Sequence, residues 1–160
     1  INFDKQISKL LYDSYSKYSN KISDEFFKLI EFSSNGFFTI TMNIFLICLY
    51  RNADSVFSLL KDILILQIID LIVSLFTKLI FRKPRPTYQK DELKFGVPIV
   101  DNYSFPSGHA SRAFSILFFI YYRIYAHQVV VSLIFVLLIC VSRILLARHT
   151  IGDVISGAIF

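Results

Sequence analysis

The chain contains no tryptophan, a single methionine and only two cysteines, and no part of it repeats another part. Cys48 and Cys140 stand alone in apolar runs, and no group of Cys, His, Asp or Glu has the spacing of a zinc or calcium site. The sequence therefore predicts no bound metal or other cofactor, and we expect both thiols to be inert members of the core. The absence of a repeat excludes a solenoid. Residues 1–30 lack the apolar core and cleavage site of a secretory signal peptide.

Apolar side chains are abundant instead. The 160 residues are 54% hydrophobic, with 17 Phe and 9 Tyr and a mean hydropathy of +0.55, which is too apolar for an ordinary soluble domain of this length. The net charge of +5 fits a basic membrane protein that faces anionic headgroups. Nucleic acid is not an expected partner, because the basic residues do not gather on one soluble face. The chain begins with Ile1 and stops at Phe160 in an apolar stretch, so we expect a trimmed chain.

The order of apolar and polar segments predicts an all-α, polytopic membrane helical bundle in a single domain. Residues 1–35 form an amphipathic segment that lies either on the membrane interface or on the surface of the bundle. Residues 36–160 form the transmembrane core. We expect about five spans, over residues 37–50, 56–81, 109–125 and 129–147, with a fifth that begins near Thr150. The one long polar loop, residues 82–108, contains prolines that prevent a continuous helix.

The number of spans decides which polar segments meet. The first two spans form a hairpin and the next two form another, so residues 1–35, the loop 82–108 and residues 143–153 share one side of the membrane. Three polar fragments are thereby expected at one face of the bundle. His127 lies in a short turn on the opposite side, where we expect a solvated side chain.

Two cations bracket the start of the loop. Lys78 lies near the end of the second span, and Arg85 lies between two prolines that stiffen its backbone. Arginine binds two phosphate oxygens with a planar fork, and lysine supplies a point charge. The alternative is the ordinary basicity of a membrane flank, since Arg82 and Lys83 are adjacent.

The segment Pro106–Ser107–Gly108–His109 predicts the start of a helix. Ser107 is a good N-cap, and Gly108 lets a ligand approach the backbone closely. Unpaired N–H groups at a helix start bind anions, and His109 would lie at the same mouth. The alternative is simple capping, with His109 as a polar residue at the rim.

His149 and Asp153 are four residues apart and share one face of a helix. A carboxylate that accepts from Nδ1–H fixes the tautomer and leaves Nε2 free to attack. Arg143 lies in a strongly apolar run, where a cation needs an anionic partner. That partner is bound phosphate or a carboxylate such as Asp70 or Asp153. A purely structural Arg–Asp pair is the alternative.

Together the fragments suggest metal-free phosphoryl transfer, as a hypothesis. His149 attacks phosphorus and becomes a phosphohistidine, and Asp153 orients it. His109 protonates the leaving oxygen and then activates water. The groups expected to hold the phosphate are Lys78, Arg85, Ser107, Gly108 and Arg143.

Three motifs carry a resemblance to a known family. Residues 78–86 read K-x6-R-P, residues 106–109 read P-S-G-H, and residues 142–153 read S-R-x5-H-x3-D. These resemble the three signature motifs of the type 2 phosphatidic acid phosphatase (PAP2) superfamily, with no departure at any signature position. The resemblance implies a helical bundle, metal independence and a phosphohistidine intermediate.

Four segments, residues 4–8, 28–33, 102–113 and 142–149, resemble more closely the type 6 phospholipid phosphatase subgroup. That resemblance implies polyisoprenoid diphosphates, such as presqualene and farnesyl diphosphate, as substrates. It also implies a location in the endoplasmic reticulum or nuclear envelope. The alternatives are a phosphatidic acid, sphingosine-phosphate or sugar phosphatase of the same superfamily, or a catalytically inactive membrane scaffold. The expected partners are a phosphorylated lipid and the bilayer, and the oligomeric state is left open.

The distribution of basic residues predicts orientation. On the side opposite the motifs lie Arg51, Lys61 and Arg123. On the motif side, apart from the proposed catalytic cations, lie Lys5, Lys9, Lys17, Lys21, Lys28, Arg82, Lys83, Lys90, Lys94, Arg112 and Arg148. The excess favours an active site that faces the cytosol.

Overall fold

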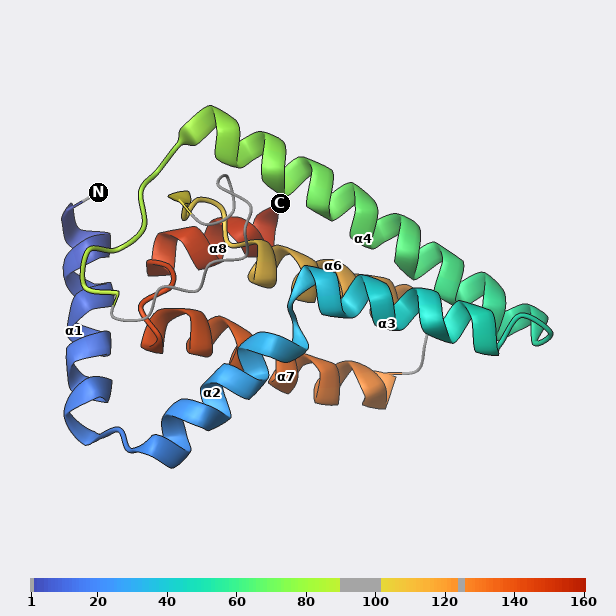
Figure 1. The fold of residues 1–160 in the computed structure, drawn as a ribbon, viewed down its shortest axis with the longest axis horizontal. Coiled ribbons are helices and arrows are strands. Elements are labelled where there is room, and N and C mark those ends of the chain that lie inside the picture. Colours follow the sequence, from blue (N-terminus) through green and yellow to red (C-terminus); the bar gives the residue numbers. More distant parts are fainter. Residues whose placement is uncertain (1, 90–101, 124–125) are drawn as a thin grey trace.

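The computed structural model describes residues 2–89, 102–123 and 126–160, which form seven helices and no strand (Figure 1). The helices, in chain order, are α1 (Asn2–Tyr18), α2 (Lys21–Ser33), α3 (Gly36–Leu49), α4 (Asp54–Phe81), α6 (Gly108–Arg123), α7 (Ala126–Leu145) and α8 (Ile151–Ile159). The part of the loop between residues 90 and 101, and the side chain of His127, lie outside the described part of the chain. The all-helical expectation is confirmed for the described ranges.

Helix α6 lies at the centre of the bundle and packs against α4, α7 and α8. Helix α3 runs along α4, α2 packs on α7, and α1 lies across the ends of α7 and α8 (Figure 1). The buried apolar cluster joins three of these helices, through Ile30, Ala113, Val136 and Ile139. Both N-terminal helices therefore pack on the bundle.

Helix α4 has the length and composition needed to cross a bilayer, with 28 residues and an apolar window of mean hydropathy 2.3. Helices α2 and α3 pass the same criterion only as a pair, bent by 54°, and α7 contributes a shorter apolar stretch, Val129–Leu145. The described residues thus contain one such helix, or two with the bent pair. Cys48 is exposed on α3, so its assignment to the core is wrong, whereas Cys140 packs partly buried beside the core cluster.

Local capping explains why the chain bends between α2 and α3. The side chain of Asn35 accepts hydrogen bonds from the amides of Phe37, at 2.9 Å, and Phe38, at 3.4 Å, and so begins a new helix. Asn20 and Ser23 form a reciprocal capping box at the start of α2. These caps fix where α2 and α3 begin, and they place residues 31–41 beside the motif-bearing helices.

The polar fragments meet at one end of the bundle, as the span count predicts. The C-terminal ends of α4 and α7 and the N-terminal ends of α6 and α8 all lie on the side where α1 crosses (Figure 1). The two ends of the polar loop are tied together there, because the Ser104 amide donates to the Lys83 carbonyl at 2.8 Å.

Candidate active site

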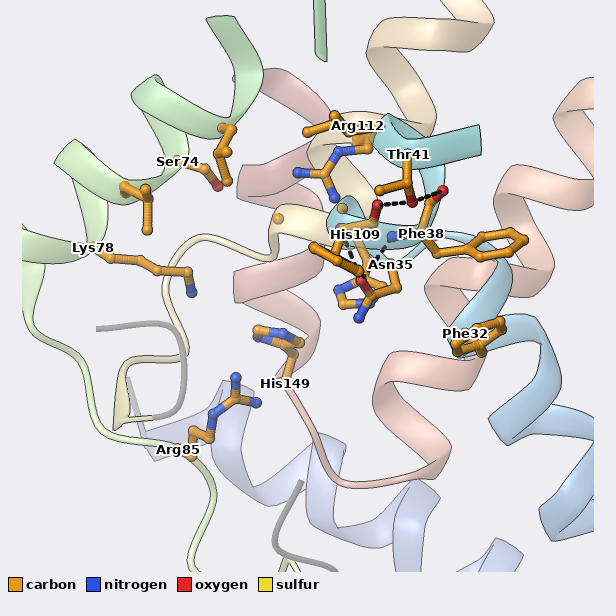
Figure 2. A pocket seen from close by; sticks show the side chains of 16 residues that line it. Phe32, Asn35, Phe38, Thr41, Ser74, Lys78, Arg85, His109, Arg112 and His149 are labelled. Carbon is orange, nitrogen blue, oxygen red and sulfur yellow. Dashed lines mark hydrogen bonds between the residues drawn. The ribbon is translucent and has the colours of Figure 1, made fainter. Parts of the chain in front are cut away.

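A cavity of about 870 Å³ lies between α3, α4 and α6 and reaches the turn between α7 and α8. The three predicted fragments contribute Lys78, Arg85, Gly108, His109 and His149 to its lining, and the other polar residues there are Asn35, Thr41, Ser74 and Arg112. The side chains of both histidines, the lysine and this arginine point toward a common space (Figure 2). The structure therefore brings five of the eight predicted site residues to one cavity.

His149 is placed by the turn that ends α7. The amides of Arg148 and His149 both donate to the carbonyl of Arg143, at 3.0 and 3.1 Å. Ala147 adopts a left-handed conformation, with φ of 55°, which is uncommon for a residue with a β-carbon. The chain thus reverses within a few residues of α7, and His149 is held next to Arg143 while being only 2% exposed.

Asp153 lies beside His149, at the start of α8. Thr150 and Asp153 form a capping box in which the Thr150 amide donates to Asp153 Oδ2 at 3.0 Å. His149 Nδ1 is 3.8 Å from the same oxygen, which is beyond hydrogen-bond distance. Within the described part of the chain, Nδ1 has no hydrogen-bond partner. The predicted pairing is thus present as proximity, without the hydrogen bond.

Lys83 holds the other oxygen of this carboxylate. Its Nζ donates to Asp153 Oδ1 at 2.7 Å and to Thr150 Oγ1 at 3.0 Å. The interpretation of Lys83 as ordinary basicity at a membrane flank is therefore wrong. Asp153 is shared between a lysine and a histidine, so Lys83 competes with His149 for its negative charge.

The environment keeps His149 neutral. Burial holds the pKa of this imidazole well below its usual range, Asp153 opposes the shift, and the surrounding cations reinforce it. A neutral imidazole retains the lone pair that a nucleophile needs.

The start of α6 is fixed against α8. The Ser107 amide donates to the Asp153 carbonyl at 3.0 Å. A β-carbon on Gly157 would lie 2.5 Å from the Ser107 carbonyl oxygen, so this close approach of the two helices requires glycine. The segment that carries His109 is therefore built directly onto the helix that carries Asp153.

Two side-chain atoms at this helix start are buried without a hydrogen-bond partner among the described residues, Ser107 Oγ and His109 Nε2. The Ser107 side chain therefore does not cap the helix, contrary to the capping interpretation. Buried polar atoms that lack partners are costly, and a bound ligand would satisfy them. Ser107 itself lies behind the cavity lining, whereas His109 faces it.

Lys78 and Arg85 are held by backbone carbonyls. Lys78 Nζ donates to the Tyr103 carbonyl at 2.8 Å, and Arg85 Nη1 donates to the Arg148 carbonyl at 3.1 Å. Lys78 is only 4% exposed although it lines the cavity. Neither cation lies on an open membrane flank.

Arg143 does not line the cavity. It is 1% exposed, and its Nη1 donates to Glu31 Oε1 in a short contact. The sequence predicts bound phosphate or a carboxylate, such as Asp70 or Asp153, as its partner; the structure supplies a carboxylate, but it is Glu31 and neither of the two named. Asp70 instead lies 3.1 Å from Arg112 Nη2 and accepts from the Ser111 hydroxyl.

Positive charge exceeds negative charge around the polar end of the cavity. Among the described residues, the carboxylates there are Asp4, Glu31 and Asp153, and the cations are Lys78, Lys83, Arg85, Arg143 and Arg148. The cavity-lining Arg112 is balanced by its partner Asp70. A surplus of buried positive charge is unfavourable unless a bound anion neutralises it. Within the described ranges, no group of three or more His, Cys, Asp or Glu side chains is placed to hold a metal ion. The arrangement therefore suits a multiply charged anion.

Most of the remaining lining of the cavity is apolar. The apolar side chains that line it come from α2, α3 and α4 and are Phe32, Phe37, Phe38, Ile40, Leu71 and Leu75. Cations and an apolar wall thus share one space, which fits an amphiphilic anion.

Two residues of the site were not singled out from the sequence, Glu31 and Arg148. Glu31 is 5% exposed and lies four residues after Phe27, so it shares a face of α2 with that apolar side chain. An acidic residue on the apolar face of an amphipathic helix was the available signal, because such a residue needs a buried partner.

Comparison with known proteins supports one family. The sequence model of the PAP2 superfamily matches residues 58–160. A probable lipid phosphate phosphatase beta of Arabidopsis thaliana is 47% identical over 57 residues, which are 36% of this chain and 26% of that protein. The chain therefore spans about a quarter of the length of that curated relative.

Two solved structures have the same fold. The crystal structure of Aquifex aeolicus LpxE covers 96% of this chain and 87% of its own, with a TM-score of 0.71 and 22% identity. A transmembrane PAP2-type phosphatidylglycerolphosphate phosphatase of Bacillus subtilis covers 98% of this chain and 78% of its own, with a TM-score of 0.76 and 19% identity. At these identities the likeness shows the fold alone.

Proposed function

Because the chain belongs to the PAP2 superfamily, we propose that it is a metal-independent membrane lipid phosphatase that works through a phosphohistidine intermediate. The observation that carries the proposal is that His109 and His149 face one cavity with a cationic end and an apolar wall. The cations stabilise the phosphoryl group as its charge develops, in the place of a divalent ion.

In the first step, the Nε2 lone pair of His149 attacks phosphorus. The bond between phosphorus and the leaving oxygen breaks, and His109 donates a proton to that oxygen. Asp153 moves within hydrogen-bond distance of Nδ1 as the imidazole becomes positive. The shared position of Asp153, 3.8 Å from His149 Nδ1 and 2.7 Å from Lys83 Nζ, supports this role.

In the second step, water attacks the phosphorus of the phosphohistidine. His109, now neutral, takes a proton from the water, the N–P bond breaks, and inorganic phosphate leaves. We propose that Lys78, Arg85 and the amides near Gly108, which line the cavity, hold the phosphoryl oxygens in both steps. We propose that Arg143 and Ser107, which lie behind this lining with Nε and Oγ unpaired, turn toward the bound phosphate and join them.

We propose a polyisoprenoid diphosphate, such as presqualene or farnesyl diphosphate, as the substrate. The resemblance to the type 6 subgroup motivates this choice. The aromatic and branched side chains of the apolar wall support a bulky hydrocarbon tail, and the surplus of cations supports two phosphates.

We propose that the chain crosses the membrane with helices α3, α4, α6, α7 and α8. Long rows of exposed apolar residues on these helices support lipid contact, for example Ile65, Ile69, Val131 and Ile134. An endoplasmic reticulum or nuclear envelope location follows from the subgroup resemblance alone.

The proposed cytosolic active site rests on fewer charges than the sequence suggests. Lys83, Arg112 and Arg148 form internal ion pairs, and Lys90 and Lys94 lie outside the described residues. The exposed cations that remain on the motif side are Lys5, Lys9, Lys17, Lys21 and Arg82. A protease-protection assay with a tag in the loop 82–108 decides the question, and a luminal tag would overturn the orientation.

The function is tested by phosphate release from the full chain in vesicles, with EDTA present. The substrates are presqualene diphosphate, farnesyl diphosphate, phosphatidic acid and glucose 6-phosphate. We expect the highest kcat/KM with the isoprenoid diphosphates. A preference for phosphatidic acid or glucose 6-phosphate would replace the substrate class but keep the chemistry. An absence of turnover on all four would favour the inactive scaffold.

A further inference from the structure

Glu31 connects α2 to the phosphate site through two buried arginines. Its Oε1 accepts hydrogen bonds from Arg143 Nη1 and, at 3.2 Å, from Arg148 Nε. Glu31 is 5% exposed and each arginine is 1% exposed, so water does not screen these contacts. A single carboxylate thus holds two guanidinium groups in the interior.

The same two arginines hold the site through their backbones. The Arg143 carbonyl accepts the amide of His149, and the Arg148 carbonyl accepts Nη1 of Arg85. Glu31 therefore fixes the side chains of residues whose main chains position the nucleophile and a phosphate-binding cation.

Charge makes this arrangement sensitive to Glu31. Arginine does not deprotonate in proteins, so both guanidiniums stay charged in the interior. Without the carboxylate they would repel each other, and at least one would move. With the carboxylate present, the group still has a net positive charge, and Arg143 Nε has no hydrogen-bond partner among the described residues. One donor of Arg143 is thus buried and unpaired just behind the cavity lining, where a small movement of the guanidinium would bring it to an oxygen of the substrate.

We propose that Glu31 is a positioning residue that aims the Arg143 guanidinium at the phosphoryl group and keeps it apart from Arg148. This inference rests on the proposed function, and it adds a residue from outside the segment that matches the family. Glu31 does not touch the phosphate itself.

A purely structural ion pair makes a different prediction from a positioning residue. Loss of a structural contact lowers the fraction of folded protein, which lowers kcat but leaves the KM and inhibition constants of the folded fraction unchanged. Loss of a positioning contact weakens binding of a transition-state mimic in the protein that remains folded. Orthovanadate, which forms a five-coordinate adduct with a histidine nucleophile, provides that readout.

The experiment compares Glu31→Gln with Glu25→Gln in the full chain. Glu25 lies on the same helix, exposed, and is paired only loosely with Lys28 at 3.6 Å, so it controls for the chemical change. For Glu31→Gln we expect kcat/KM to fall by about 10²-fold and the vanadate inhibition constant to rise by a similar factor. Glu31→Asp should recover part of both losses. Glu25→Gln should match the wild type.

A double variant keeps the test decisive. If Glu31→Gln does not fold, Glu31→Gln/Arg148→Gln removes one charge of each sign and is expected to fold with the same loss of vanadate affinity. A double variant that also fails to fold, or an unchanged vanadate constant in either variant, would overturn the proposal.

Vanadate binding also separates this inference from the proposed function. Protection of the wild type against thermal unfolding by vanadate is measured without turnover. If the wild type binds vanadate but hydrolyses none of the substrates, the proposed function is wrong. The vanadate constants of the Glu31 and Glu25 variants then still test the positioning role of Glu31. If the wild type does not bind vanadate, both proposals fail.

Discussion

Residues 58–160 and residues 1–57 reach the same cavity but bring different kinds of side chain to it. The first segment matches the family and supplies both histidines and the cations that line the cavity. The second supplies a carboxylate behind the site, Glu31, and much of the apolar wall, including Phe37 and Ile40. The comparison suggests that the shared segment performs the chemistry, while the N-terminal segment supports it and contacts the substrate tail.

The N-terminal segment supports the site at a second point. The Gly152 amide donates to Asp4 Oδ1 and the Ile151 amide donates to Ser8 Oγ, both at 2.9 Å. Negative charge near the N-terminus of a helix stabilises it, so α1 helps to hold the first turn of α8. That turn carries Asp153.

The strongest test of the comparison is removal of the proposed nucleophile. His149→Ala should lower kcat by at least about 10⁴-fold on every substrate, because the phosphohistidine cannot form. The folded state should persist, since Nδ1 of this imidazole has no hydrogen-bond partner in the described part of the chain. Phosphate release and thermal unfolding check the two halves of this prediction. His127→Ala, at the opposite end of the bundle, is the control and should keep wild-type activity. Substantial turnover by His149→Ala would show that His149 is not the nucleophile.

The second test separates the roles of the two histidines within the motif segment. With a diphosphate substrate, His109→Gln should still form the phosphohistidine, because a phosphate leaving group needs less help from an acid than an alcohol does. Hydrolysis of the intermediate should slow by about 10²–10⁴-fold, because no base activates water. A substrate labelled with ³²P in its terminal phosphate should therefore label the protein.

The matched control for this trapping experiment is the double variant His109→Gln/His149→Ala, which should take up no label. Label in the double variant would place the covalent intermediate elsewhere. No label in His109→Gln alone would mean that His109 is also required for the first step.

The sequence predicted much of the fold because membrane helices are long and apolar and because polar segments mark their ends. The helix content and the meeting of three polar fragments follow from that pattern alone. The bend at Asn35 was not predicted, because a capping side chain that starts a second helix within an apolar run leaves the hydropathy unchanged.

The candidate site was predicted less completely than the fold. Residues within short motifs could be found because their spacing is local, as for His149 and Asp153. The Glu31–Arg143 pair joins residues 112 positions apart, so no local spacing contains it. Lys83 was set aside because four cations in a short stretch look alike in sequence, and only the fold shows that this one meets Asp153.

The third test uses pH to examine the shared carboxylate. Turnover requires neutral His149, so kcat should fall as pH drops through the pKa of this imidazole, which burial holds below its usual range. Asp153→Asn removes a negative charge that favours the protonated form, so the acid limb should move to lower pH, and kcat at neutral pH should fall about 10²-fold. Lys83→Gln removes a positive charge and should move the acid limb to higher pH, with a smaller loss.

The opposite signs make this pair of variants informative. The substrate phosphate itself ionises near pH 6, and it does so equally with the wild type and with both variants. Its contribution therefore cancels when the acid limb of each variant is compared with that of the wild type. Kinetic profiles in which both variants shift in the same direction would mean that Lys83 and Asp153 do not act on the same imidazole.

The smallest expected effect concerns the apolar wall and separates the two segments most directly. Ile40 lines the cavity from α3, and Ile44, one turn further along, is 46% exposed and does not line it. Ile40→Phe should narrow the space for a long tail and lower kcat/KM for presqualene diphosphate about 10-fold relative to farnesyl diphosphate. Ile44→Phe should change neither value.

A substrate without a hydrocarbon tail gives the decisive contrast, since the cationic end is left intact in Ile40→Phe. Any slow turnover of glucose 6-phosphate should be unchanged in this variant, although His149→Ala abolishes it. An equal loss on substrates with and without a tail would show that Ile40 supports the catalytic end instead. In that case residues 1–57 would contribute to chemistry as well as to tail recognition, and the division between the two segments would fail.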